Sequence, residues 1–222
     1  MQSPVLRGYR SDVGAESKKP TGIVRGEDGM PRCWWGDSPP EYRAYHDREW
    51  GFPVADDVRL FEKLSLEGFQ SGLSWLTILR KRDAFRRAFA GFDFSTIARF
   101  DQRDVSRLLA DASIVRHRGK IEAVINNARH AVELVEAEGS LAAFMWRFEP
   151  APRAAAIDRG AVLAQTDESR ALARELKRRG WRFVGPTTVY AFMQAMGLVN
   201  DHMEGCVAWA EVEQARAGFT RP

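Results

Sequence analysis

Two cysteine–histidine pairs stand near opposite ends of this sequence. The first is carried by the stretch CWWGDSPPEYRAYH, residues 33–46, which begins with Cys33 and ends with His46. The second is carried by HMEGC, residues 202–206, which begins with His202 and ends with Cys206. Two thiolates and two imidazoles form a ligand set found in closed, tetrahedral structural zinc sites. If the four side chains converge, one zinc ion ties the two ends of the fold together and stabilises it by closing a long loop.

Two other interpretations of the cysteines stay open at this point. The spacing between the two pairs is not that of a standard zinc finger, so Cys33 and Cys206 could instead form one disulfide or be unrelated buried thiols. A disulfide is disfavoured if the protein is cytosolic, because that compartment keeps thiols reduced.

Composition is typical of a cytoplasmic globular enzyme. The chain has 222 residues, 45% of them hydrophobic, which is enough for one domain or two small lobes with a packed core. We find neither a signal peptide nor a membrane-spanning run and expect no membrane association. The net charge is only +3, but basic clusters near residues 80–87, 116–120 and 177–182, together with 11% aromatic residues, favour a polyanionic partner.

Helical periodicity dominates from residue 40 onward and predicts an all-α fold of two helical lobes with a cleft between them. Helices are expected to begin after Asp56 and Ser74 and to cover residues 120–138, 167–179 and 187–196. The polar composition of residues 1–29 predicts a flexible extension, and Met30 is an alternative first residue of the protein. The folded domain is expected over residues 30–210, followed by a tail over 211–222.

Residues 111–120 connect a short amphipathic helix to a long one. This is the layout of a helix–hairpin–helix, expected near residues 104–130, in which backbone N–H groups bind a phosphate and basic side chains flank it. Arg116, Arg118 and Lys120 would supply the positive charge. A plain turn between helices with surface arginines explains the segment equally well. Ser113 stands where such hairpins usually have a glycine with positive φ, a geometry that serine adopts at some cost.

The run LEGFQSGLSW, residues 66–75, places a carboxylate, Glu67, at the end of an apolar helix. Glu67 is either exposed at a helix break or lies in a pocket where it accepts hydrogen bonds from a ligand while Trp75 stacks on it. Tyr42, Tyr45 and Trp50 surround His46 in the sequence, so a metal bound there would also hold these aromatic side chains in place.

Four collinear blocks between Arg32 and Cys206 resemble the 3-methyladenine DNA glycosylase I family. They are RCxW (32–35), YxxYHDxEWG (42–51), LEGxQxGLSW (66–75) and the segment from FVG (183–185) through GLVNDHxxGC (197–206). The resemblance implies a helix–hairpin–helix DNA repair enzyme with its termini tied by one structural Zn²⁺. It further implies a monomer that acts on double-stranded alkylated DNA in the cytoplasm, at the nucleoid.

The same resemblance assigns the site residues. It implies that the zinc ligands are Cys33, His46, His202 and Cys206, and that the catalytic residue is Glu67, which reads the base together with Tyr45. The remaining pocket residues would be Trp75, Tyr42, Trp35 and Trp50. Adenine methylated at N3 is cationic and leaves as a neutral base, so the enzyme has to flip out and recognise the nucleotide rather than activate it. Ionised Glu67 is expected to favour the cationic base, and the family is expected to lack an aspartate near the sugar carbon.

Two alternative functions remain from the sequence. One is a zinc-stapled DNA-binding module without catalysis, which would bind undamaged DNA and release no base. The other is a metal-dependent hydrolase, but catalytic zinc normally keeps three protein ligands and an open position.

Overall fold

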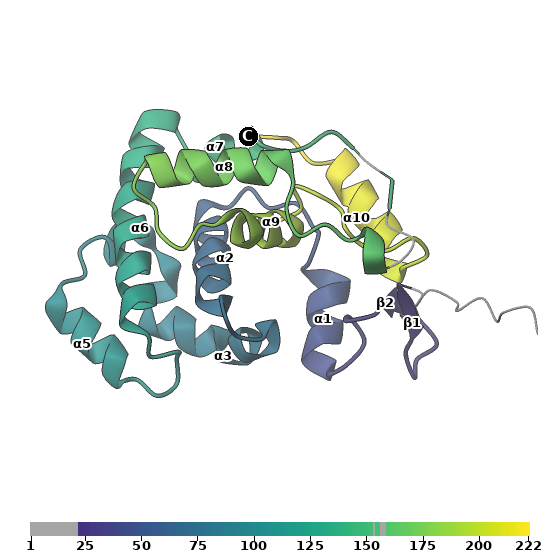
Figure 1. Cartoon of the computed structure of the whole chain (residues 1–222), viewed down its shortest axis with the longest axis horizontal. Helices are drawn as coiled ribbons and strands as arrows, with labels where there is room; N and C mark the ends of the chain where they lie inside the picture. Colours follow the sequence, from purple (N-terminus) through teal and green to yellow (C-terminus); the bar gives the residue numbers. More distant parts are fainter. Residues whose placement is uncertain (1–21, 153, 156–158) are drawn as a thin grey trace, which may run out of the picture.

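The computed structural model describes residues 22–152, 154–155 and 159–222 (Figure 1). These residues form ten α-helices, two short 3-10 helices and one two-stranded antiparallel sheet. The α-helices are α1 (Pro40–Arg48), α2 (Asp57–Gln70), α3 (Trp75–Ala88), α4 (Phe94–Ile97), α5 (Gln102–Ala110), α6 (Arg118–Glu138), α7 (Leu141–Trp146), α8 (Asp167–Arg178), α9 (Pro186–Ala195) and α10 (Val207–Ala217). The remaining elements are β1 (Ile23–Arg25), β2 (Pro31–Cys33), η1 (Ala90–Phe92) and η2 (Arg159–Ala161).

Helix α2 is the centre of the molecule. It packs against α3, α6, α7 and α9, and ten consecutive residues, 60–69, are buried along it. A helix that is buried all round must find partners for any charged side chain it carries, and α2 carries Glu62, Lys63 and Glu67 in this stretch.

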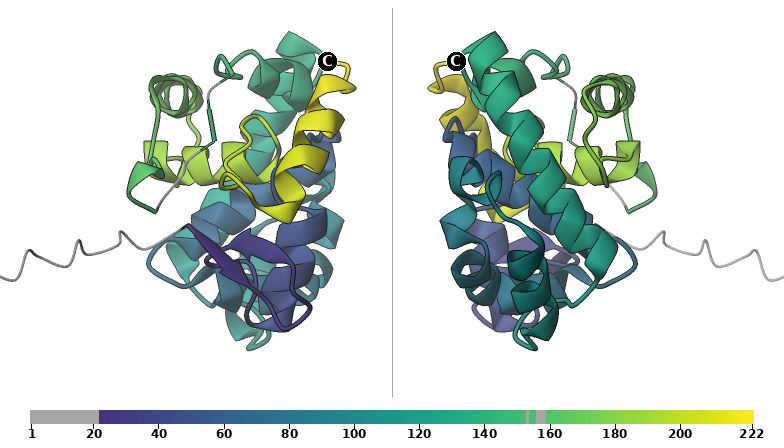
Figure 2. Two further views of the ribbon diagram at one scale, coloured as in Figure 1. Left: turned by 90° about the vertical axis from the view of Figure 1, so that its right-hand side faces the viewer. Right: turned by 90° about the vertical axis from the view of Figure 1, so that its left-hand side faces the viewer.

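The first and last described elements lie side by side. Helix α10 packs against α1 and β2, and Figure 2 shows the sheet, α1 and α10 gathered at one end of the molecule. Helices α5 and α6 stand at the opposite end in Figure 1. The chain therefore returns to its starting point after the helices of the core.

The expected all-helical class is confirmed apart from the small sheet. The capping predictions also hold, since Asp56 accepts a hydrogen bond from the Arg59 N–H and Ser74 accepts one from Thr77. Sequence periodicity missed β1 and β2 because each has only three residues, too few to show alternation. None of the helices in the described ranges is long and apolar enough to cross a membrane.

Two predicted boundaries differ from the structure. Residues 23–25 pair with β2, so the expected extension does not continue unfolded to residue 29, while residues 1–21 lie outside the described residues. The expected tail from residue 211 begins inside α10, which runs to Ala217 and buries Val212. Backbone pairing holds residues 23–25 on the domain, while burial of Val212 and packing of Phe219 on Trp146 hold the segment after residue 211.

The turn between α5 and α6 forms without a left-handed residue at Ser113. Its backbone N–H and its hydroxyl both donate to the Asp111 carboxylate, at 2.8 and 2.5 Å, and its φ is not positive. Asp111 thus shapes the turn through side-chain hydrogen bonds. The strain expected for serine in place of glycine does not arise.

Lys120 points inward, which does not fit its predicted contact with DNA. Its ammonium donates to the carbonyls of Phe69 and Ser71 at the end of α2, at 2.8 and 2.5 Å, and the residue is buried. These carbonyls lack helical partners, and a cation near a helix C-terminus is favourable. Lys120 therefore fastens the start of α6 to the end of α2.

Replacing Lys120 by methionine is expected to lower the free energy of unfolding by about 1–3 kcal/mol, because the Phe69 and Ser71 carbonyls lose their donor. Arg118→Met is the matched control, since Arg118 is exposed and, among the described residues, pairs only with Glu122, and it should cost about 0.5 kcal/mol or less. Urea denaturation measures both. Equal stability of the two variants would contradict this role of Lys120.

Candidate metal centre and aromatic pocket

The four predicted metal ligands converge. Cys33 comes from β2, His46 from α1, and His202 and Cys206 from the segment before α10, and all four are buried. Their ligand atoms lie within 4.8 Å of one another. Both cysteines are free thiols, which removes the disulfide alternative.

The distances between these atoms match a tetrahedral ion. Cys206 Sγ lies 3.4 Å from His46 Nε2 and 3.5 Å from His202 Nδ1, and Cys33 Sγ lies 3.7 Å from His202 Nδ1. Usual zinc–sulfur and zinc–nitrogen bond lengths at tetrahedral angles give a sulfur–nitrogen separation of about 3.6 Å. Three of the six separations between the ligand atoms thus match those expected around one tetrahedral cation.

The other nitrogen of each imidazole has an acceptor. His46 Nδ1 lies 2.7 Å from the Asp47 carboxylate, and His202 Nε2 lies 3.0 Å from the backbone carbonyl of Trp50. Each neutral ring keeps its proton on that side, so the unprotonated nitrogen faces the thiols. Arg32 fixes Asp47 in turn, through contacts of 3.0 and 2.8 Å.

The thiols have donors as well. The Met203 N–H lies 3.2 Å from Cys33 Sγ. Hydrogen bonding with the Cys33 thiol lowers the pKa of the Cys206 thiol below its usual range and raises the pKa of Cys33. The negative charge of the pair is therefore favoured at Cys206, and a metal ion binds cysteine as the thiolate.

Two glycines allow the backbone to approach the imidazoles closely. A Cβ on Gly36 would lie 2.2 Å from the His46 ring. Gly51 has φ +91°, and a Cβ there would lie 3.2 Å from the ring of His202. Side chains at either position would push the imidazoles out of place.

A cavity of about 300 Å³ opens beside this cluster. Its wall contains all six residues predicted for the base pocket: Trp35, Tyr42, Tyr45, Trp50, Glu67 and Trp75. The sequence reasoning had not assigned the other wall residues, which are Trp34, Gln70, Val162, Ala191, Gln194 and Asp201. Gln70 and Asp201 stood inside the quoted blocks, so their motif positions were the available signal.

The metal cluster and the cavity share a wall. The Trp35 ring packs edge to face against His46 and against Trp50, with 5.0 Å between centroids in each pair. The Trp50 ring packs against His202 at 4.8 Å. Tyr42 completes the wall, and its hydroxyl accepts a hydrogen bond from the Leu76 N–H at the start of α3. Fixing the two imidazoles therefore fixes the indole rings that line the cavity.

Glu67 has a buried cationic partner that the sequence reasoning missed. Lys63 Nζ lies 2.9 Å from Glu67 Oε1, and it donates to the Tyr45 hydroxyl at 2.5 Å. The same ammonium lies 3.4 Å from the centroid of the Trp75 ring. Lys63 and Glu67 are four residues apart, so the signal was two charges on one face of an apolar helix.

This pair bears on the expectation that ionised Glu67 favours the cationic base. Burial lowers the pKa of Lys63, and the nearby Glu67 carboxylate opposes this shift by favouring the charged ammonium. An ion pair at 2.9 Å has little net charge. Glu67 therefore presents the cavity with a hydrogen-bond acceptor rather than with an uncompensated negative charge.

The cavity wall also holds an aspartate, which the resemblance had not led us to expect. Asp201 is buried and accepts hydrogen bonds from Tyr190 and Gln194, at 2.6 and 2.8 Å.

Among the predicted DNA-contacting residues, Arg116 and Arg118 are exposed at the hairpin, unlike Lys120. The structure thus leaves two of the three basic side chains accessible to a phosphate.

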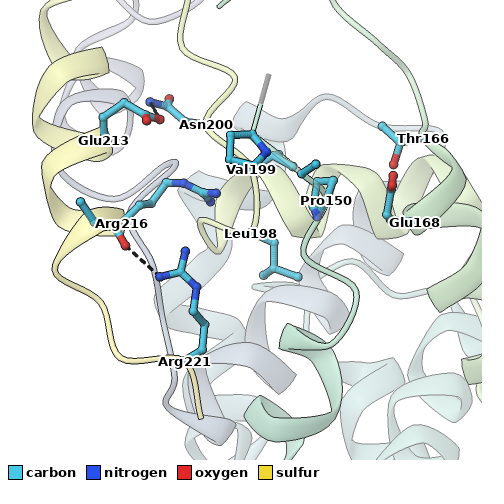
Figure 3. Close-up of a pocket in the computed structure, with 12 residues that line it drawn as sticks. Pro150, Thr166, Glu168, Leu198, Val199, Asn200, Glu213, Arg216 and Arg221 are labelled. Atoms are coloured by element: carbon cyan, nitrogen blue, oxygen red, sulfur yellow. Dashed lines mark hydrogen bonds between the residues drawn. The ribbon is translucent and has the colours of Figure 1, made fainter. Parts of the chain in front are cut away.

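A second cavity, of about 410 Å³, lies between α10 and the segments that flank α8 and α9 (Figure 3). Its polar side chains are engaged with protein partners. Arg216 and Arg221 pair with Glu149 at 2.9 and 2.8 Å, and Asn200 donates to Glu213 at 2.8 Å. None of the residues predicted for the site lines it. The aromatic cavity is therefore the better candidate site.

The chain is similar to known proteins. The family model described as methyladenine glycosylase matches residues 34–209. DNA-3-methyladenine glycosylase 1 of Escherichia coli (strain K12) is 46% identical, over 81% of this chain and 97% of its own length. DNA-3-methyladenine glycosylase of Haemophilus influenzae is 42% identical, over 79% and 96%. A solved structure on 3-methyladenine recognition by the Staphylococcus aureus 3-methyladenine DNA glycosylase I superimposes with a TM-score of 0.76 at 35% identity, covering 80% of this chain and 96% of that one.

Asp47→Asn should weaken metal binding by about 10- to 100-fold, because a neutral amide oxygen is a weaker acceptor for the His46 N–H than the carboxylate and orients the ring less firmly. Asp37→Asn is the control, since Asp37 also contacts Arg32, at 3.3 Å, but no contact to the cluster histidines is seen in the described part. Competition with a chelator measures both affinities. An equal loss in the two variants would show that orientation of His46 is not the cause.

Proposed function

The chain belongs to the methyladenine glycosylase family, and from this membership we infer that it is a DNA-3-methyladenine glycosylase. It removes 3-methyladenine from alkylated DNA by hydrolysing the bond between base and sugar, the first step of base excision repair. The observation that carries this function is the cavity in which Glu67 and five aromatic side chains from separate motifs meet.

The chemistry required of the protein is access and recognition. An adenine alkylated at N3 carries a positive charge that is lost when the base leaves, so the leaving group needs little activation. The nucleotide has to be flipped out of the duplex at a cost of a few kcal/mol, which damage reduces. Cation–π attraction by tryptophan and tyrosine faces contributes about 2 kcal/mol when the cation is desolvated. Water then attacks the sugar carbon.

We assign recognition of the base to Glu67 and Tyr45. The Glu67 carboxylate accepts from the exocyclic amine of adenine, and guanine is rejected because it presents an oxygen at that position. Trp35, Tyr42, Trp50 and Trp75 enclose the ring. This assignment is supported by the position of all six residues in one cavity wall and by the pairing of Glu67 with Lys63, which leaves Oε2 to face a ligand.

The metal is proposed to be one structural Zn²⁺ held by Cys33, His46, His202 and Cys206. The chemistry of two thiols and two imidazoles and their tetrahedral spacing support this ion. When bound, it would join β2 and α1 to the segment before α10. Four protein ligands leave no open position for water, which argues against a metal-dependent hydrolase.

The proposed partner is double-stranded alkylated DNA, bound by a monomer in the cytoplasm. Exposed Arg116 and Arg118 at the α5–α6 turn support a phosphate contact there. The helix–hairpin–helix over residues 104–130 is proposed as the element that holds the duplex while the nucleotide enters the cavity. The domain proposed for this activity spans residues 30–210.

Removing the metal is expected to destabilise the fold, because the cluster closes a loop that spans most of the chain. We expect one zinc per chain by elemental analysis, a lower melting temperature after chelation, and loss of activity that follows unfolding. Readdition of Zn²⁺ should restore both. An apo-protein that stays folded to the same temperature but is inactive would instead indicate a catalytic metal.

Duplex DNA treated with dimethyl sulfate provides the test of function. The protein should release 3-methyladenine without appreciable 7-methylguanine, as resolved by chromatography. Glu67→Gln should lower the rate by about 10- to 100-fold, the value of one hydrogen bond to a charged group. Glu62→Gln is the matched control, because Glu62 lies on the same helix and pairs with Arg86 but does not line the cavity.

If the folded, metal-loaded protein releases no base, the glycosylase function is wrong, and the non-catalytic DNA-binding function becomes the better account. Equal rates for the two glutamate variants would remove Glu67 from base recognition. Circular dichroism of each variant separates loss of activity from loss of fold.

A further inference from the structure

The buried ammonium of Lys63 lies behind the wall of the base cavity. A smaller cavity on the other side of this wall is lined by Lys63, together with Tyr45 and Trp75. Tyr45 and Trp75 line both cavities. Lys63 lines only the smaller cavity, and Glu67 lines only the base cavity. Lys63 therefore reaches Glu67 and Tyr45 from behind and stays out of the space available to a base.

The contacts of Lys63 restrict the hydrogen-bond direction of Tyr45. An ammonium has three donors and no acceptor, so the Tyr45 oxygen accepts from Lys63 and its own proton has to point elsewhere. In the described part of the chain, no hydrogen bond joins Tyr45 to Glu67, because Lys63 stands between them at 2.5 and 2.9 Å. The hydroxyl proton is left for a partner in the cavity.

The contact with Lys63 also determines which oxygen of Glu67 is left to accept a hydrogen bond from a ligand. Its Oε1 accepts from Lys63, and Oε2 has no protein partner among the described residues. An ionised carboxylate only accepts. The wall of the cavity thus presents one donor, from Tyr45, and one acceptor, from Glu67.

This combination matches one edge of adenine. Along that edge, adenine offers an acceptor at N7 and donors at the exocyclic amine, whereas guanine offers acceptors at N7 and O6. A donor and an acceptor side by side complement the edge of adenine. The same edge of guanine would instead place O6 against the Glu67 carboxylate, and two acceptors do not bind each other. The Tyr45 donor and the Glu67 acceptor distinguish adenine from guanine only if the Tyr45 hydroxyl does not donate its proton to another group of the protein.

We propose that Lys63 is a positioning residue for base recognition, because it directs the Tyr45 hydroxyl to donate to N7 and leaves Glu67 to accept from the amine. The proposal rests on the function inferred above and adds a residue that touches no base. Without the ammonium, the Tyr45 hydroxyl is free to donate to the Glu67 carboxylate, and the cavity loses its donor toward N7.

The test compares two free bases, 3-methyladenine and 3-methyl-7-deazaadenine, in which a C–H group replaces N7. Binding is measured by quenching of tryptophan fluorescence, and the readout is the ratio of the two dissociation constants. A general loss of packing weakens both bases and leaves this ratio unchanged. The parent protein should bind the 7-deaza base about tenfold more weakly, the value of one hydrogen bond.

Lys63→Met should reduce this ratio to below about twofold, because the donor to N7 is lost. Tyr45→Phe should do the same, and the double variant should show no further change, since Lys63 acts through Tyr45. Lys63→Arg, which also has only donors, should keep the tenfold ratio. Lys81→Met is the control, because that ammonium contacts the carbonyls of Ala112 and Ser113, and it should keep the ratio as well.

A full tenfold ratio in Lys63→Met, or a ratio near one in the parent, would overturn the proposal. If Lys63→Met does not fold, Lys63→Leu gives the same test, because leucine also has no donor for the Tyr45 oxygen. Release of 3-methyladenine from methylated DNA by the parent is assayed in parallel. Release together with an unchanged ratio in Lys63→Met overturns only the role of Lys63, whereas absence of release overturns the proposed function itself.

Discussion

The convergence of Cys33, His46, His202 and Cys206 is the constraint on which the site depends. It brings residues separated by most of the sequence to within 4.8 Å and places the last helix against the first. The two imidazoles are also structural parts of the pocket, because Trp35 and Trp50 pack against them and the Trp50 carbonyl orients His202. A metal ion bound at this point would therefore link the closure of the chain to the shape of the cavity.

In the proposed function, the cavity recognises its ligand through shape and hydrogen-bond direction. Glu67 is paired with Lys63, so the pocket has an oriented acceptor and little net charge, and the aromatic rings provide the attraction for a cation. Such a design suits a substrate whose leaving group is already activated. Discrimination between damaged adenine and other purines then depends on how Tyr45 and Glu67 are held, and α2 holds them from behind.

Motifs with a local physical basis could be predicted from the sequence. The helix starts at Asp56 and Ser74 follow from capping, and the metal ligands follow from the pairing of thiols with imidazoles. Positions that depend on tertiary packing could not be predicted. Lys63 carried no signal of its own and Lys120 was expected to contact DNA, but Glu67 draws Lys63 into the core and the carbonyls at the end of α2 hold Lys120. The turn at Ser113 was misjudged because the side chain of Asp111 provides what a glycine was expected to provide.

A crystal structure of the zinc-loaded protein with 3-methyladenine bound would test the central claim most directly. The account predicts the base in the cavity beside Trp35 and Trp50, with its amine at Glu67 Oε2, its N7 at the Tyr45 hydroxyl, and zinc between the four ligands. A base bound instead in the cavity near Arg216, or one that contacts neither Glu67 nor Tyr45, would contradict the account.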